Sequence, residues 1–258
     1  MTQEETATAT ATKPARLLDL GRREFGEVWA LQRELLVARQ KGEISDTLIL
    51  VEHPHVITAG RSAHKENLLG AVWTEPGAAR QSPSREGAGT LSGFSQTVDG
   101  VPFFEIERGG DVTYHGPGQL VAYPIVLLRD GERDLHKYLR NLEEAVIRTC
   151  ARFELAADRE PGKTGVWTGD GDERKKLCSM GIACRKWVTF HGLALNVTTD
   201  LAYFARINPC GFESRIMSSL ADRLGRDVDI AAAKRALIDE LGDVLGRAAI
   251  TETAASVA

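Results

Sequence analysis

The sequence has no hydrophobic run long enough to cross a membrane. Its most apolar stretch, residues 120–128, is much shorter than the ~20 residues that span a bilayer. Residues 1–12 are rich in Thr and Ala and lack the basic start and apolar stretch of a signal peptide. We therefore expect a cytoplasmic protein.

Positive charge is not in excess either. The chain has 32 Lys and Arg against 36 Asp and Glu, a net charge of -4, which argues against non-specific nucleic-acid binding through a basic surface. With 43% apolar and 26% charged residues, the composition excludes collagen-like, fully disordered and disulfide-scaffold proteins. A chain of 258 residues can fold around one large core, so we expect one catalytic domain.

Cysteine is scarce and irregularly spaced. The four residues are Cys150, Cys178, Cys184 and Cys210, which we interpret as reduced thiols. The separation of Cys178 and Cys184 does not match a zinc-binding spacing and no second pair accompanies them, so we expect no metal site. Cys150 lies on the apolar face of a predicted helix and is expected in the core.

The pattern along the chain predicts three segments. Residues 1–14 are expected to be a disordered leader, residues 15–250 a single catalytic domain, and residues 251–258 a disordered tail. Within the domain, residues 75–100 are rich in Gly, Pro, Ser and Arg, which favours a flexible insertion loop.

Hydrophobic periodicity predicts helices over 23–39, 134–153 and 229–247, the second with Asp134 as its N-cap. Strands are expected at 47–52, 56–59, 102–108, 120–128, 165–168, 176–184, 187–191 and 193–197. Because strands come in runs rather than alternating with helices, we expect an α+β fold with a mixed or antiparallel sheet and flanking helices.

Residues 108–119, with the sequence RGGDVTYHGPGQ, form a glycine-rich segment between two predicted strands. Glycine lets the backbone bend at positive φ or approach a ligand closely. The segment is not a P-loop, because no Gly-Lys-Ser/Thr ends it. A tight bulged turn explains the glycines equally well, whereas the clustered Arg, Tyr and His favour a binding loop.

Two further places contain residues suited to chemistry. Lys176 begins an apolar strand, where a lysine is usually a solvated edge residue, and His191 precedes Gly192, where a buried core histidine is the commoner case. Cys210 lies between Pro209 and Gly211, so a rigid turn would present its thiol. The alternative is a cysteine buried as a small hydrophobic residue.

Together these segments resemble the octanoyl-(acyl-carrier-protein):protein octanoyltransferase family, also called lipoyl(octanoyl) transferases. The similarity covers roughly residues 45–220, with weaker support from residues 53–61. The matching segments are 108–119, 176–181, 191–196 and 208–211. The segment at 75–100 departs from the pattern because it is longer than expected for the family.

The resemblance implies a fold like that of biotin protein ligases and lipoate–protein ligases. It implies Cys210 as the nucleophile and Lys176 as the residue that activates it. The substrate-binding residues it implies are Arg108, Gly109, Gly110, Asp111, Val112, Thr113, Tyr114, His115, Ser179, Met180, Gly181, Gly192, Leu193 and Ala194.

The resemblance also implies the partners. The donor would be octanoyl-acyl carrier protein, and the acceptors would be lipoyl domains of 2-oxoacid dehydrogenase complexes and the glycine cleavage H protein. No cofactor, metal, nucleic acid or membrane would take part, and the enzyme would work as a monomer.

These residues suit the reaction. A free thiol has a pKa of ~8.5, and a nearby ammonium lowers it by about 1–3 units, which makes the thiolate a major species. Exchange of one thioester for another needs no ATP. Two alternatives remain at this stage: an ATP-dependent lipoate–protein ligase that needs no cysteine, and a binding module without turnover.

Overall fold

The core is organised around a seven-stranded mixed sheet. The computed structural model describes residues 15–70, 72–74, 96–209, 213–247 and 250–252. In spatial order the strands are β12 (Ile250–Glu252), β1 (Ala15–Arg22), β2 (Thr47–Glu52), β8 (Gln119–Ile125), β11 (Val188–Asn196), β10 (Lys175–Arg185) and β9 (Val166–Thr168). The pairs β12–β1 and β1–β2 are parallel and the other four are antiparallel.

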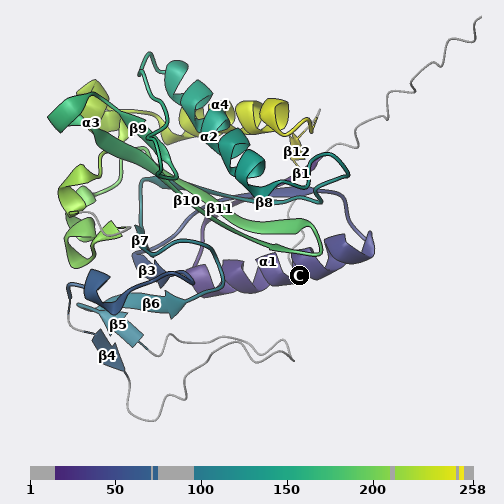
Figure 1. Ribbon diagram of the computed structural model, residues 1–258, viewed down its shortest axis with the longest axis horizontal. Coiled ribbons are helices and arrows are strands. Elements are labelled where there is room, and N and C mark those ends of the chain that lie inside the picture. The colour runs from purple at the N-terminus through teal and green to yellow at the C-terminus, as the bar shows by residue number, and fades with distance from the viewer. Residues whose placement is uncertain (1–14, 71, 75–95, 210–212, 248–249, 253–258) are drawn as a thin grey trace, which may run out of the picture.

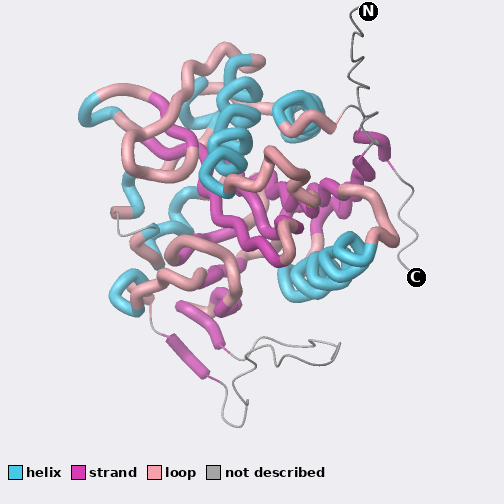
Figure 2. The backbone as a smooth tube through the Cα atoms, turned by 45° about the vertical axis from the view of Figure 1, so that its right-hand side comes forward, coloured by secondary structure: helices cyan, strands magenta, loops and turns pink. Residues whose placement is uncertain are grey.

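Helices cover both faces of this sheet. Helices α2 (Leu135–Ala151) and α4 (Ile230–Val244) pack on one face, and α1 (Phe25–Lys41) packs on the other (Figure 1). Figure 2 shows the same three-layer arrangement from a second direction, with α1 separated from α2 by the strands. The central strands β8 and β11 are buried throughout because they are covered on both sides.

A smaller sheet lies beside α1. Its order is β4 (Val72–Thr74), β5 (Gln96–Val98), β6 (Val101–Glu105), β3 (Val56–Ala59) and β7 (Val112–His115), with only β3–β6 parallel. Phe25 at the start of α1 contacts Phe104 of this sheet, with ring centroids 5.3 Å apart. The small sheet therefore packs against the same side of the large sheet as α1.

Short helices complete the described fold. They are the five-residue α3 (Leu220–Leu224) and the 3-10 helices η1 (Lys65–Asn67), η2 (Gly171–Glu173), η3 (Leu201–Arg206) and η5 (Ser214–Ile216). Phe204 of η3 and Met217 after η5 pack into the core of the small sheet. No helix in the described ranges is both long and apolar enough to cross a membrane.

The predicted α+β class, with a mixed sheet and flanking helices, is confirmed. The three predicted helices form, and the Asp134 side chain caps α2 by accepting from the backbone N–H groups of His136 and Lys137 at 2.9 and 3.0 Å. The strands predicted at 47–52 and 56–59 also form as expected. The segments predicted as two strands at 187–191 and 193–197 form one continuous strand, β11.

Several boundaries were wrong. The expected loop over 75–100 ends earlier, because Gln96–Val98 form β5 and pair with β6; residues 75–95 lie outside the described part of the chain. The expected disordered tail from residue 251 begins in a strand, since β12 pairs with β1. Residues 1–14 and 253–258 lie outside the described residues.

Candidate active site

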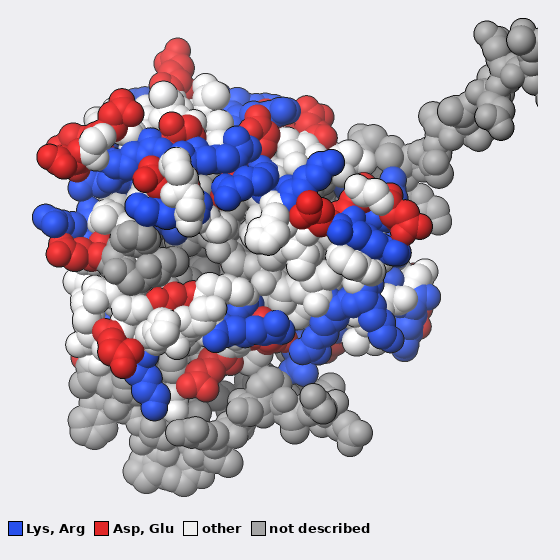
Figure 3. Space-filling model, in the orientation of Figure 1, with Lys and Arg blue, Asp and Glu red and all other residues white. Residues whose placement is uncertain are grey.

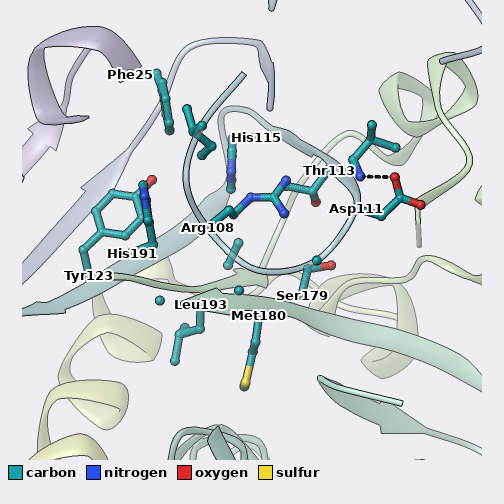
Figure 4. Close-up of a pocket in the computed structure, with 16 residues that line it drawn as sticks. Phe25, Arg108, Asp111, Thr113, His115, Tyr123, Ser179, Met180, His191 and Leu193 are labelled. Carbon is teal, nitrogen blue, oxygen red and sulfur yellow. Dashed lines mark hydrogen bonds between the residues drawn. The ribbon is translucent and has the colours of Figure 1, made fainter. Parts of the chain in front are cut away.

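A cleft lies between the segment that follows β6 and the β10–β11 ribbon (Figure 4). It encloses about 480 Å³ of empty space, part of which is open to solvent. The residues that line it are Phe25, Ile106, Arg108, Gly110, Asp111, Val112, Thr113, His115, Tyr123, Ser179, Met180, Gly181, His191, Gly192, Leu193 and Ala194. Segments far apart in the sequence thus meet at one place.

Most of the residues predicted to bind substrate lie together at this cleft. The exceptions are Gly109 and Tyr114, which do not line it. Tyr114 is fully buried on the far side of its strand, where its hydroxyl is 2.8 Å from His55 Nδ1 and its ring packs edge-on against Phe204. Gly109 holds the loop in place, because its N–H donates to the Ile182 carbonyl over 2.8 Å.

Arg108 and Asp111 shape the cleft through contacts inside the protein. The Arg108 guanidinium is buried and donates to the carbonyl and hydroxyl oxygens of Thr58 at 2.7 and 3.0 Å. One oxygen of Asp111 accepts from the backbone N–H of Val112 at 2.8 Å and from that of His64 at 3.2 Å, and the other accepts from Asn67. These bonds fix the loop between β6 and β7.

The polar side-chain atoms at the cleft without a hydrogen-bond partner in the described part of the chain include Thr113 Oγ1, Ser179 Oγ and His191 Nε2. A buried polar atom left unpaired costs about 1–3 kcal/mol. These atoms can therefore form hydrogen bonds with a bound ligand, but an alkyl chain has no polar atom that could pair with them.

Four lining residues were not among the predicted site residues: Phe25, Ile106, Tyr123 and His191. His191 lies in a matching segment, but a buried core histidine is the commoner case for such a residue. The backbone φ of His191, 57°, distinguishes it from an ordinary core residue, since a non-glycine residue at positive φ is uncommon. Phe25 comes from a distant helix, and amphipathic periodicity does not show that its ring reaches the cleft.

Two buried histidines, His115 and His191, line the cleft, and a third, His53, lies against His115 with ring centroids 5.9 Å apart. Burial lowers the pKa of His53 to about 4, and burial together with neighbouring positive charge lowers the pKa of His115 and of His191 to about 3. His53 is fixed by Tyr123, whose hydroxyl lies 2.9 Å from its Nε2. At neutral pH all three rings are uncharged, so they act as hydrogen-bonding groups rather than cations.

Lys176 is buried, not a solvated edge residue. It is 2% exposed, and its Nζ lies 5.4 Å from the centre of the Trp167 ring. Gly165 leaves the room it needs, because a Cβ at that position would come within 2.7 Å of Lys176 Cε. Lys176 does not line the cleft itself, but it is on β10, three residues before Ser179.

Cys210 lies outside the described residues, so its predicted approach to Lys176 stays a prediction. The three other cysteines are described. Burial raises the pKa of Cys150 to about 12 and also raises the pKa of Cys178 and Cys184, which makes their thiolates scarce. Cys150 is in the core, as expected. Among the described residues no cluster of His, Cys, Asp and Glu could hold a metal ion.

The molecular surface carries charge of both signs. On the face shown in Figure 3, Lys and Arg side chains form bands above and below a mainly uncharged central region. Most arginines on α2 and near it are paired with carboxylates, for example Arg152 with Glu240 at 2.7 Å and Arg148 with Glu144 at 3.0 Å.

Comparison with known proteins gives consistent results. A family model described as the lipoyl protein ligase A/B catalytic domain matches residues 24–242. An octanoyltransferase of Geobacter metallireducens is 43% identical over 219 residues, which cover 85% of this chain and 88% of that protein. An octanoyltransferase of Rubrobacter xylanophilus is 43% identical over 223 residues, covering 86% and 89%.

Solved structures show the same fold. Lipoate-protein ligase A bound with ATP is similar with a TM-score of 0.68 at 18% identity, covering 93% of this chain and 88% of that one. A bi-partite lipoate protein ligase with its E2 lipoyl domain from Thermoplasma acidophilum is similar with a TM-score of 0.64 at 18% identity, covering 94% and 88%. The expected likeness to the lipoate–protein ligase fold is thereby confirmed.

Proposed function

The chain belongs to the octanoyltransferase family, and from this premise we propose that it transfers an octanoyl group from octanoyl-acyl carrier protein to a lysine of lipoyl domains. The acyl group would pass through a thioester on Cys210, with Lys176 as the residue that activates the thiol. In this proposal residues 15–250 act as a single catalytic domain, as a monomer in the cytoplasm.

The observation that supports the proposal most strongly is the burial of Lys176 on the strand that lines the cleft. Lys176 lies at the start of β10, and Ser179, Met180 and Gly181 of the same strand border the cleft. An ammonium beside a thiol lowers the pKa of the thiol by about 1–3 units. After it has lost its proton, the same amine can accept one from the attacking lysine of the acceptor.

The cleft suits an acyl chain. Ile106, Met180, Leu193 and Ala194 supply apolar surface along its walls. Burying the six methylenes and the methyl group of an octanoyl chain at about 0.8 kcal/mol each contributes roughly 5 kcal/mol. The unpaired hydroxyls of Thr113 and Ser179 suit the polar thioester end or the arm of the donor better than the alkyl chain.

The acceptor is proposed from the relatives. Two proteins named octanoyltransferase share 43% identity with this chain, and one fold neighbour is a bi-partite lipoate protein ligase described together with its E2 lipoyl domain. We propose lipoyl domains of 2-oxoacid dehydrogenase complexes and the glycine cleavage H protein as acceptors. The energy of the donor thioester is sufficient for amide formation, so transfer should need neither a cofactor nor ATP.

Intact-mass analysis tests the proposal directly. The full chain is mixed with octanoyl-acyl carrier protein, with and without ATP, and the expected result is one octanoyl adduct that hydroxylamine removes. Cys210→Ser should abolish the adduct, whereas Cys184→Ser, the partly exposed cysteine among those described, should keep it. Modification that requires ATP and free octanoate would instead identify an acid-activating ligase.

A further inference from the structure

A chain of buried amides connects the wall of the cleft with the segment that packs against Lys176. Asn196 on β11 and Gln119 on β8 are 0% and 1% exposed, and Gln119 Nε2 donates to Asn196 Oδ1 over 2.9 Å. At one end Asn196 Nδ2 donates to the Ser218 carbonyl over 3.0 Å. At the other end Gln119 Oε1 lies 2.7 Å from His115 Nδ1.

The Ser218 carbonyl fixes the direction of every hydrogen bond in this chain, because it can only accept. Asn196 must turn its NH₂ group toward it, so its Oδ1 faces Gln119. Gln119 must then present its own NH₂ group, which also donates to the Tyr114 carbonyl at 3.2 Å. Only Gln119 Oε1 is left for His115. The proton of the neutral ring is therefore on Nδ1, and Nε2 carries a lone pair.

The Ser218 end of the same chain reaches Lys176. The N–H of Ser218 donates to the Lys176 carbonyl over 3.0 Å, and Met217 pairs with Lys176 as a parallel bridge. The peptide groups of Ser218 are thus held on both sides, by Lys176 and by Asn196. One amide chain therefore sets the position of the His115 ring and of the backbone at Lys176.

We propose that Gln119 and Asn196 are positioning residues, which hold His115 as the Nδ1-protonated tautomer so that its Nε2 accepts a hydrogen bond from an N–H group of the substrate. The substrate in this inference rests on the proposed function, whereas the tautomer rests on the hydrogen bonds alone. His115 is placed for this role, because its ring lines the cleft and stacks on Phe25 with centroids 6.1 Å apart.

The groups around His115 keep the ring neutral. Burial is the largest influence on its pKa, and His53, Arg108 and His191 also lower it, while the hydrogen bond to Gln119 opposes them. His53 lies in the loop after β2, Arg108 lies in the loop after β6, and His191 is on β11. Phe25 of α1, which stacks on the His115 ring, carries no charge. His115 Nε2 therefore remains a hydrogen-bond acceptor throughout the neutral pH range.

Nitrogen-15 NMR of the full chain labelled at its six histidines tests the tautomer. The His115 signals are assigned by their loss in His115→Gln. The wild type should show a protonated Nδ1 and an unprotonated Nε2 at pH 7. Gln119→Glu places a carboxylate beside Nδ1 and should raise the pKa of His115 by roughly 1–2 units.

The matched control is Gln32→Glu. Gln32 is an equally buried amide whose Oε1 accepts from the His191 N–H at 2.8 Å, so this variant places the same charge beside a different histidine. It should leave the tautomer and pKa of His115 unchanged. If Gln119→Glu does not fold, Gln119→Met should still give a mixture of both His115 tautomers.

Transfer assays give a second readout. In Gln119→Glu, octanoyl transfer relative to the wild type measured at the same pH should fall about 10-fold as pH decreases through the raised pKa of His115, because a protonated ring cannot accept. Asn196→Asp replaces the donor to the Ser218 carbonyl with a carboxylate oxygen and keeps the acceptor for Gln119, so at neutral pH it should keep the His115 tautomer and lower kcat.

A wild-type His115 protonated on Nε2, or a Gln119→Glu spectrum identical to that of the wild type, overturns the inference. The expected tautomer in a chain that transfers no octanoyl group would contradict the proposed function instead. The two failures are therefore distinguishable, because the NMR measurement needs no turnover.

Discussion

Gly181, which lines the cleft, lies directly against Gly109: a Cβ at residue 181 would come within 2.5 Å of the Gly109 carbonyl oxygen. The loop after β6 therefore rests on β10 through two backbones, with the Gly109 N–H bonded to the Ile182 carbonyl. This contact closes one side of the cleft. It also explains why glycine is needed at residue 181, which is not at positive φ.

We expect Gly181→Ala to displace this loop and to lower octanoyl transfer about 10-fold, with a loss of about 1–3 kcal/mol in the free energy of unfolding from overpacking. The matched control is Gly109→Ala, whose Cβ would meet its nearest neighbour, the Ile182 carbonyl, at an ordinary 3.4 Å. Transfer rates and urea unfolding of the two variants should differ clearly. Equal behaviour would show that the close approach at residue 181 is unimportant.

Lys176 and Lys163 both lie over the ring of Trp167, with their Nζ atoms 5.4 and 5.0 Å from its centre. Only Lys176 is buried. We expect Lys176→Met to reduce octanoyl transfer by about 10²–10⁴, the range for loss of a group that moves protons, and to raise the pKa of Cys210. The pH dependence of Cys210 alkylation measures that pKa. Lys163→Met should retain wild-type values; a similar loss in both would indicate a general effect on Trp167.

Some of the fold follows directly from local sequence. Asp134 followed by an apolar stripe predicts α2, because the side chain satisfies backbone N–H groups that no helical carbonyl can reach. The edge pairing of β1 with β12 has no such signal. It joins residues from opposite ends of the chain, and only the tertiary fold brings them together.

The site was predictable where a motif is local and not where it depends on distant contacts. The glycine-rich segment and the β10 and β11 motifs identified most of the cleft. The burial of Lys176 was not foreseen, because a lysine that begins a strand is usually solvated. Gly165 and Trp167 provide its pocket, and neither is adjacent to it in the sequence.

Asp46 joins three parts of the structure. One of its carboxylate oxygens accepts from Arg39 at the end of α1 at 2.7 Å and from the Leu127 N–H at 3.0 Å, and the other accepts from Arg247 at 2.7 Å. Asp46→Ala would leave Arg247 buried without this carboxylate, and we expect it to cost about 3–5 kcal/mol of unfolding free energy.

Urea unfolding at pH 7 measures the loss at Asp46. Asp130→Ala breaks an exposed ion pair with Arg133 and should change the free energy of unfolding little. A small effect at Asp46 would mean that Arg247 relaxes onto Glu132, its other partner at 3.0 Å. That outcome would contradict the prediction that the Asp46 carboxylate is essential to the junction.

The buried histidines predict how stability depends on pH. Burial lowers the pKa of His53 to about 4, whereas in the unfolded chain it is 6.5. Between these values the unfolded state binds the extra proton, so stability is fully present above pH 6.5 and is lost as pH falls toward 4. At pH 4.5 His53 alone should cost about 2 kcal/mol of unfolding free energy, and His115 and His191 should add to this loss.

Urea unfolding at pH 7 and pH 4.5 measures the loss of unfolding free energy. His53→Gln, which cannot be protonated, should reduce the difference between the two pH values by about 2 kcal/mol, even if it lowers stability at both; an unchanged difference would mean that carboxylates alone cause the acid sensitivity.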